Sequence, residues 1–133
     1  MSFMAWDENY SIDNELLDGH HKELFQIFRK LNEKCMADDT AETYSVILDE
    51  LEAYSDYHFT AEENCMNEAE YTYAQSHMLL HKFYMTRILE IKLKMYRKEY
   101  KLCHELILFL GNWLQKHVIG EDKQMSCTLC KTV

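Results

Sequence analysis

Four successive segments of this chain repeat apolar residues at intervals of three and four positions, and the chain contains no proline. Apolar residues at this spacing line one side of an α-helix, and that side must be buried against other helices. Only three glycines occur, so the chain also lacks the turn residues that an all-β protein needs. The sequence therefore predicts an all-α fold, with helices near residues 17–35, 41–65, 73–95 and 99–117.

The predicted connections between these helices are only a few residues long. Short connections force consecutive helices to run antiparallel, which gives an up-down-up-down four-helix bundle. The length of 133 residues fits one domain. We expect a single domain over residues 1–133, with an N-terminal arm at 1–16 that Trp6 and Tyr10 anchor, and a short C-terminal tail at 123–133.

The composition excludes several classes of partner. A formal net charge of -9 disfavours nucleic acids and anionic membrane surfaces, which bind clustered Lys and Arg. No apolar run is long enough to span a membrane, and the N-terminus lacks a basic leader. Cys35, Cys65 and Cys103 fall inside helical segments, which favours buried reduced thiols over disulfides. We expect a cytoplasmic, monomeric protein, and the sequence identifies no protein partner.

Histidines and carboxylates interrupt the apolar stripes near one end of each predicted helix. In an antiparallel bundle these positions all lie at the same end, where a buried polar side chain is costly unless something satisfies it. Each helix supplies at least one of them, which together predict a site for two metal ions. The seven candidate ligands are His21, His58, Glu62, His77, His81, His117 and Asp122.

The spacing of the candidates is informative within each helix. Residues four apart share a helix face. His58 and Glu62 are such a pair, although pairs of this kind are common by chance. His117 and Asp122 are five apart, about 140° on a regular helix, so they converge only if the helix ends or bends. Gly120 lies between them and is the expected cause. His20 is turned outward by about 100° from the stripe, which makes it a less suitable ligand than its neighbour.

The number and type of donors limit the choice of metal. Five imidazoles and two carboxylates are too many for one tetrahedral zinc ion. Imidazole suits iron, copper, nickel and zinc, whereas calcium and magnesium prefer oxygen ligands. Ferritin-like di-iron bundles use Glu-x-x-His repeats and several carboxylates, and no such repeat is present here. Fewer anionic ligands favour reversible ligand binding over oxygen activation.

The chain resembles the hemerythrin family over almost its whole length, and its size is similar to that of stand-alone bacteriohemerythrins. Two departures from the usual family pattern are Gly19-His20 in place of Glu-Gln and Glu70-Tyr71-Thr72 in place of Gly-Tyr-Pro. The matching segments are Asp18-x-x-His21, Leu51-x-x-Tyr54-x-x-x-His58-Phe59-x-x-Glu62, His77-x-x-x-His81 and Trp113-Leu114-x-x-His117-x-x-x-x-Asp122.

The resemblance implies a division of the ligands between two iron ions. His77, His81 and His117 would hold one iron, and His21 and His58 the other. Glu62, Asp122 and an oxo or hydroxo group would bridge them. The second iron would keep an open position, where dioxygen binds.

Apolar side chains around such a centre must exclude water. From helical offsets we expect five residues to do so, with ordinary core packing as the alternative for each. They are Leu24, Phe25, Phe59, Trp113 and Leu114.

The leading functional hypothesis is a protein that binds dioxygen reversibly for storage, delivery or sensing. The alternatives are an enzyme on the same centre, which reduces nitric oxide or peroxide or oxidises ferrous iron, and an iron-storage protein. Cys127-x-x-Cys130 is either a redox or metal pair or part of a reduced tail, and a single such pair is weak evidence.

Overall fold

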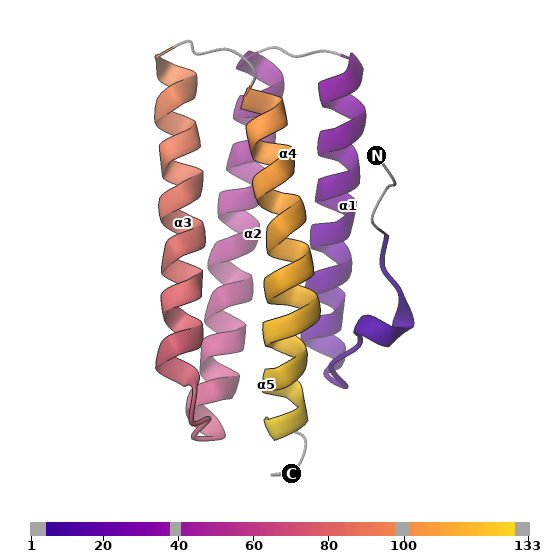
Figure 1. The fold of residues 1–133 in the computed structure, drawn as a ribbon, viewed down its shortest axis with the longest axis vertical. Coiled ribbons are helices and arrows are strands. Elements are labelled where there is room, and N and C mark those ends of the chain that lie inside the picture. Colours follow the sequence, from indigo (N-terminus) through magenta and orange to yellow (C-terminus); the bar gives the residue numbers. More distant parts are fainter. Residues whose placement is uncertain (1–4, 38–40, 98–101, 130–133) are drawn as a thin grey trace.

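The computed structural model describes residues 5–37, 41–97 and 102–129 as an antiparallel four-helix bundle (Figure 1). The predicted all-α, four-helix fold is confirmed. The last three helical elements run on from one another as a single rod, which forms the fourth member of the bundle (Figure 1). The elements are η1 (Glu8–Tyr10), α1 (Glu15–Ala37), α2 (Ala41–Glu68), α3 (Ala74–Tyr96), α4 (Leu102–Trp113), the π-helix η2 (Leu114–Glu121) and α5 (Asp122–Leu129).

The N-terminal arm is fixed to the start of α1 by side-chain hydrogen bonds. Asn14 Oδ1 accepts from the Leu17 N–H at 3.1 Å, as a helix N-cap does. Asp18 accepts from the Ile12 N–H at 2.8 Å and from the Ser11 hydroxyl at 2.6 Å. These bonds tie the arm to the first turn of the helix that carries His21.

Two aromatic side chains of the arm pack on Phe25, in the positions that the sequence indicated. The Tyr10 ring stacks on the Phe25 ring with centroids 5.7 Å apart, and the Trp6 ring meets it edge-on at 6.0 Å. Phe25 is itself buried. The arm therefore covers the outer side of α1 next to the end of the bundle that carries the histidines (Figure 1).

The turn from α2 to α3 is tight and contains a strained residue. The Tyr71 N–H donates to the Met66 carbonyl at 2.9 Å, and the Glu70 N–H to the Asn67 carbonyl at 3.3 Å. Glu70 has φ 52, the left-handed conformation that closes such a helix end. A residue with a Cβ pays a steric cost there that glycine avoids. The glutamate therefore adopts a conformation that glycine adopts at lower cost.

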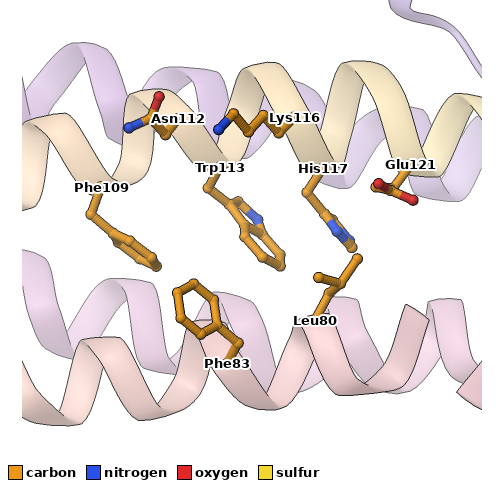
Figure 2. A pocket seen from close by; sticks show the side chains of 8 residues that line it. All are labelled: Leu80, Phe83, Phe109, Asn112, Trp113, Lys116, His117 and Glu121. Atoms are coloured by element: carbon orange, nitrogen blue, oxygen red, sulfur yellow. The ribbon is translucent and has the colours of Figure 1, made fainter. Parts of the chain in front are cut away.

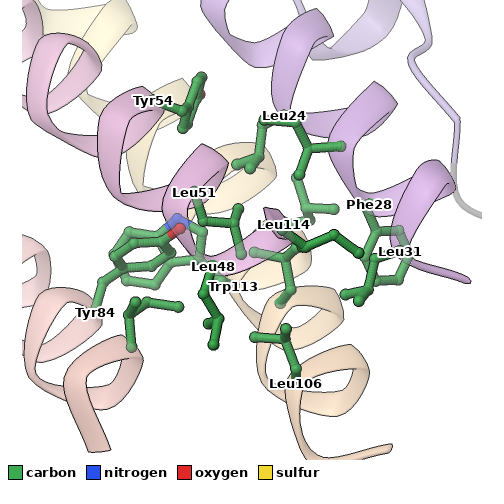
Figure 3. Packing of buried hydrophobic residues seen from close by; sticks show 14 of the residues in the cluster. Leu24, Phe28, Leu31, Leu48, Leu51, Tyr54, Tyr84, Leu106, Trp113 and Leu114 are labelled. Carbon is green, nitrogen blue, oxygen red and sulfur yellow. The ribbon is translucent and has the colours of Figure 1, made fainter. Parts of the chain in front are cut away.

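Apolar side chains from all four members of the bundle fill its interior (Figure 3). Leu51 of α2, Leu106 of α4 and Leu31 of α1 have no exposed surface. Leu24 of α1 and Leu114 of the neighbouring fourth member lie in the same cluster. A second, smaller cluster is separate from this core and consists of Ile12, Leu17, Met66, Tyr71 and Met125.

A disulfide joins Cys35, in the last turns of α1, to Cys103, near the start of α4. The expectation of reduced thiols is therefore wrong for these two residues. These two cysteines therefore do not support the expectation of a reducing, cytoplasmic compartment. The physical reason is that antiparallel neighbours bring the end of α1 beside the start of α4, and a separation of 68 residues gives no hint of this contact.

The remaining cysteines differ in what the structure describes. Cys65 is unpaired and half-buried. Cys130 lies outside the described residues, and so does the side chain of Cys127, so the Cys-x-x-Cys hypothesis is not examined by the structure. Among the described helices, none is both long and apolar enough to cross a membrane.

Candidate metal centre

Seven histidine and carboxylate side chains from all four members of the bundle meet at one end. Each is at most 3% exposed. Because α1 and α3 contribute near their first turns, and α2 near its last turns, antiparallel packing brings these positions to one level (Figure 1). The structure thus brings together all the ligands that the sequence suggested, His21, His58, Glu62, His77, His81, His117 and Asp122.

The donor atoms form two groups that share a residue. Each group offers four donor atoms within 4.8 Å of one another, which is the arrangement that a bound cation needs. Glu62 belongs to both groups. The first group is Glu62, His77, His81 and His117, and the second is His21, His58, Glu62 and Asp122.

Glu62 extends between the two groups with one oxygen toward each. Its Oε1 lies 3.0 Å from His81 Nε2 and also contacts His77 Nε2. Its Oε2 lies 3.2 Å from His58 Nε2. A carboxylate in this orientation can bridge two cations.

Asp122 has the same orientation from the opposite side. Its Oδ1 lies 2.9 Å from His77 Nε2 and 3.1 Å from His117 Nε2, whereas its Oδ2 lies 3.0 Å from His21 Nε2. Each carboxylate therefore faces both sets of imidazoles.

A π-helix brings His117 and Asp122 to the same side. The Asp122 N–H donates to the His117 carbonyl, a bond between residues five apart, and residues five apart lie close to one face in such a helix. The expectation that the helix ends or bends here is wrong, because the wider turn aligns the two side chains within a continuous rod.

Gly120 does not cause this geometry. It has no positive φ, and a Cβ at this position would meet only the Gln115 carbonyl at 3.9 Å, an ordinary contact. The convergence of the side chains therefore depends on the hydrogen-bond pattern of η2, and glycine is not required for it.

Hydrogen bonding alone leaves this set of side chains unsatisfied. Among the described residues, neither ring nitrogen of His21 or His117 has a hydrogen-bond partner of acceptable angle, and nor does either oxygen of Asp122. The Asp122 oxygens nevertheless lie 3.0 Å from His21 Nε2 and 3.1 Å from His117 Nε2. The lone pairs are therefore aimed at shared points between the residues, and cations at those points would satisfy them.

Three imidazoles of this cluster, those of His21, His77 and His117, have pKa values above the ordinary one when no cation is bound. Burial opposes the charged form of His21, but the carboxylates of Asp122 and Glu62 outweigh it and raise its pKa to about 9. The same balance raises the pKa of His77 to about 10. Burial also opposes ionisation of Glu62 and Asp122, yet the surrounding histidines hold both carboxyl pKa values well below the usual range. Protons and metal ions would therefore compete for the same nitrogens.

Two ligand candidates are oriented by side chains behind them. Glu63 accepts a hydrogen bond from His81 Nδ1 at 2.8 Å, which leaves Nε2 facing Glu62. His20 Nδ1 lies 3.0 Å from His58 Nδ1, and the His58 Nε2 faces the centre. Such outer partners fix the tautomer and orientation of metal-binding histidines.

The position of His20 departs from the sequence expectation. It is half-buried and contacts α2, whereas the helical offset alone turned it outward. It belongs to neither donor group. The difference arises because its imidazole is long enough to reach the neighbouring helix.

Aromatic side chains of the predicted apolar surroundings stack on two of the ligand candidates. The Phe59 ring lies 3.9 Å from that of His81 with an interplanar angle of 8°. Trp113 stacks on His117 at 4.0 Å and 13°. With Leu24, Phe25 and Leu114 these residues are all buried, as the sequence suggested.

Tyr54 is a residue near the centre that the sequence analysis named in a family-matching segment without giving it a role at the site. Its ring stacks on His58 at 5.2 Å, and its buried hydroxyl has no hydrogen-bond partner among the described residues. Burial raises its pKa well above the usual value, so the hydroxyl remains a hydrogen-bond donor. The signals in the sequence were its position four residues before His58 and its place in the segment Leu51-x-x-Tyr54-x-x-x-His58.

A pocket of about 370 Å³ opens between α3 and the rod formed by α4 and η2 (Figure 2). Leu80, Phe83, Phe109 and Trp113 form its apolar wall. His117 also lines it, and Figure 2 shows its ring beside Leu80. One ligand candidate of the centre therefore also lines a pocket between these helices.

This fold and donor set define a class of helical bundles that bind cations at one end. Residues 13–129 match the family model described as "Hemerythrin HHE cation binding domain". The chain belongs to the hemerythrin family. It is 31% identical over 123 residues to a bacteriohemerythrin from Campylobacter jejuni, with 92% of each chain covered. It is 27% identical over 125 residues to a bacteriohemerythrin from Stenotrophomonas maltophilia, covering 92% of this chain and 79% of that protein.

Solved structures support the same fold. A crystal structure of a hemerythrin mutant superimposes with a TM-score of 0.86 at 23% identity, covering 97% of this chain and 98% of the other. A second mutant of hemerythrin gives the same values.

Proposed function

We propose that this protein binds dioxygen reversibly at a non-heme di-iron centre. His77, His81 and His117 hold one iron ion, and His21 and His58 hold the other. Glu62 and Asp122 bridge the two. The iron pair would supply the two electrons that dioxygen takes up on binding and returns on release.

The unequal division of the histidines is the observation that carries this proposal. With both carboxylates counted, one ion has five protein donors and the other has four. Iron commonly takes six ligands, so an oxo or hydroxo bridge would complete the first ion and would leave one position of the second ion for a small external ligand. Membership of a cation-binding family and similarity to bacteriohemerythrins support iron as the metal and dioxygen as that ligand.

The surrounding side chains of this chain have two tasks in the proposed function. Phe59 and Trp113, stacked on ligand histidines, and Leu24, Phe25 and Leu114 nearby exclude water, which would otherwise compete for the open position. Glu63 and His20 hold the rings of His81 and His58 so that Nε2 faces the metal.

An optical spectrum of the reduced protein tests the proposal. The protein is assayed for iron, reduced without air, and recorded before air is added, after it is added and after it is removed again. We expect two irons per chain and a charge-transfer band that appears in air and disappears on deoxygenation. The matched control is Glu62→Ala, which should lose both iron and the band.

Other results would favour the alternatives. Immediate and lasting conversion to a ferric form would support the enzyme, with nitric oxide, peroxide or ferrous iron as the substrate to test next. Far more than two irons per chain would support storage. Absence of tightly bound iron in the folded protein would contradict all three.

A further inference from the structure

Helix α3 carries large apolar side chains on the side that faces away from the core. They are strongly exposed, and five of the ten exposed large apolar residues in the described part of the chain lie on this helix. Monomeric proteins rarely leave such side chains together in water, so a row of them indicates an interaction surface. The residues, with their exposed fractions, are Leu79 (64%), Phe83 (59%), Leu89 (54%), Leu93 (46%) and Tyr96 (72%).

These five residues share one side of the helix with Lys82, Thr86 and Glu90, and we call this side the outer face of α3. At 100° per residue they fall within an arc of about 140°. The opposite arc carries His77, His81, Tyr84, Ile88 and Ile91, which are buried in the bundle. Helix α3 is thus apolar on two sides, although its position at the edge of the bundle in Figure 1 needs only one.

The outer face is self-complementary about Thr86. When two copies of a helix pack antiparallel, residues at equal distances on either side of the centre lie at the same level. With Thr86 at the centre, Leu79 meets Leu93 of the second copy, and Phe83 meets Leu89 of the second copy. The small exposed side chain of Thr86 then meets itself at the two-fold axis.

Charges on the same helix agree with this register. Lys82 and Glu90 lie four residues on either side of Thr86, so each would face the oppositely charged residue of the second copy. Glu90 is 53% exposed and has Arg87 as a neighbour at 2.9 Å, which leaves its carboxylate open to a second cation. If the second helix is shifted by three or four residues from this register, Lys82 lies opposite Leu93 or Lys94, which is less favourable.

The apolar surface continues from the outer face toward α4. The Phe83 ring lies 6.4 Å from the Phe109 ring, and Figure 2 shows Phe83 beside Trp113 at the edge of the pocket. Leu108 of α4 is 49% exposed. A second copy on α3 would therefore also cover part of this pocket.

We propose that the protein forms a two-fold symmetric dimer in which the outer faces of two α3 helices pack antiparallel with Thr86 at the centre. The sequence analysis expected a monomer, and the exposed fractions along α3 favour a dimer instead. A helix of 23 residues is about 34 Å long. One helix pair of this length lies at the lower end of the size range for specific interfaces, so we expect a dimer whose population rises with protein concentration.

Sedimentation equilibrium of the intact protein, from about 1 to about 100 μM, tests the proposal. We expect the mass to rise with concentration from 16.0 kDa toward twice that value. Leu93→Asp should weaken the dimer by about tenfold or more, because two carboxylates enter an apolar contact. Leu16→Asp is the matched control, since Leu16 is 59% exposed on α1 and should have no effect.

A charge exchange tests the register. Lys82→Glu and Glu90→Lys should each weaken the dimer, and the double variant should restore it. Circular dichroism and thermal unfolding of every variant check that the fold is intact.

Three outcomes would overturn the proposal. The first is a mass of 16.0 kDa at every concentration, including the case in which the outer face instead binds another protein or a lipid vesicle. The second is a dimer that Leu93→Asp leaves unchanged. The third is a double charge variant that remains as weak as the single variants.

Discussion

At the end of the bundle away from the histidines, Leu31, Ile47 and Leu106 have no exposed surface, and at the other end Glu62 and Asp122 are buried to the same degree. The two ends therefore differ in what they bury. Burial of apolar side chains stabilises the first of these ends, and a disulfide joins α1 to α4 there. Burial of the polar side chains stabilises the other end only if cations neutralise the carboxylates and bind the imidazole nitrogens.

The comparison teaches that stability and chemistry are separated along the bundle axis. The apolar end, with Leu106 and the disulfide at Cys35, supports the fold without metal. The polar end can then hold two carboxylates and five histidines in place before any cation arrives. Predictions can break or sharpen this division.

The largest expected effect is that of Glu62→Ala on metal binding. Glu62 is the residue shared by both donor groups, so its loss should weaken both sites by more than the roughly 100-fold that loss of an outer partner costs. Metal content after competition with a chelator is the measurement. Glu50→Ala is the control, because Glu50 is a half-exposed carboxylate of α2 that pairs with Lys30 at 3.0 Å. Equal metal content in the two variants would show that Glu62 is not a ligand.

The disulfide should affect stability and leave the metal unaffected. Replacing Cys35 and Cys103 by serine should lower the free energy of unfolding by between about 3 and about 5 kcal/mol, because the bond closes a long loop in the unfolded chain. Urea unfolding measures this loss, with Cys65→Ser as the control. The division between the two ends would be disproved if the double variant also lost its metal.

Loss of the partner behind His81 should weaken metal binding moderately. Glu63→Ala removes the acceptor of the His81 Nδ1–H, and we expect a loss of about 10- to 100-fold in affinity for the ion of the three-histidine group. Titration with the metal measures it, and Asp56→Ala, at an exposed position of the same helix, is the control. A fully retained affinity would mean that packing alone orients the ring.

The metal-free protein should lose stability as the pH rises above neutrality. His21 and His77 have folded-state pKa values of about 9 and about 10, above the ordinary 6.5, so their contribution is complete below pH 6.5 and disappears as the pH passes 9 to 10. Urea midpoints of the chelator-treated protein from pH 6 to 10 measure the trend. The metal-loaded protein is the comparison, and a flat profile of the metal-free protein would contradict the geometry of the cluster.

The smallest effect concerns the turn between α2 and α3. Glu70→Gly should raise the free energy of unfolding by up to about 1 kcal/mol, because glycine adopts the left-handed conformation at lower cost. Thermal unfolding measures this gain, and Asp56→Gly, at an exposed position in the interior of α2, should destabilise instead. Destabilisation by Glu70→Gly would show that the side chain compensates for the strain.

Most of the fold followed from the spacing of apolar residues, because helices with one apolar side and short connections have few ways to pack. The positions of His58 and Glu62 on one stripe, and of His81 on another, followed from the same rule. Their convergence needed only the antiparallel order of the helices.

The rest depended on interactions that spacing does not express. A regular helix separates His117 from Asp122, and only the π-helical hydrogen bonds align them. The contact between His20 and His58 and the bond between Cys35 and Cys103 join residues on different helices. Helical offsets describe one helix at a time and carry no information on such contacts.

The sequence by itself determined that this chain is a four-helix bundle with polar ligand-type residues collected at one end, because burial of the apolar stripes leaves no other arrangement. The tertiary structure alone decided how both carboxylates face two sets of histidines, which side chains orient the rings, and that α3 keeps an exposed apolar face. These features depend on differences of a few ångströms in the positions of neighbouring helices. Such differences are set by the packing of all the side chains together.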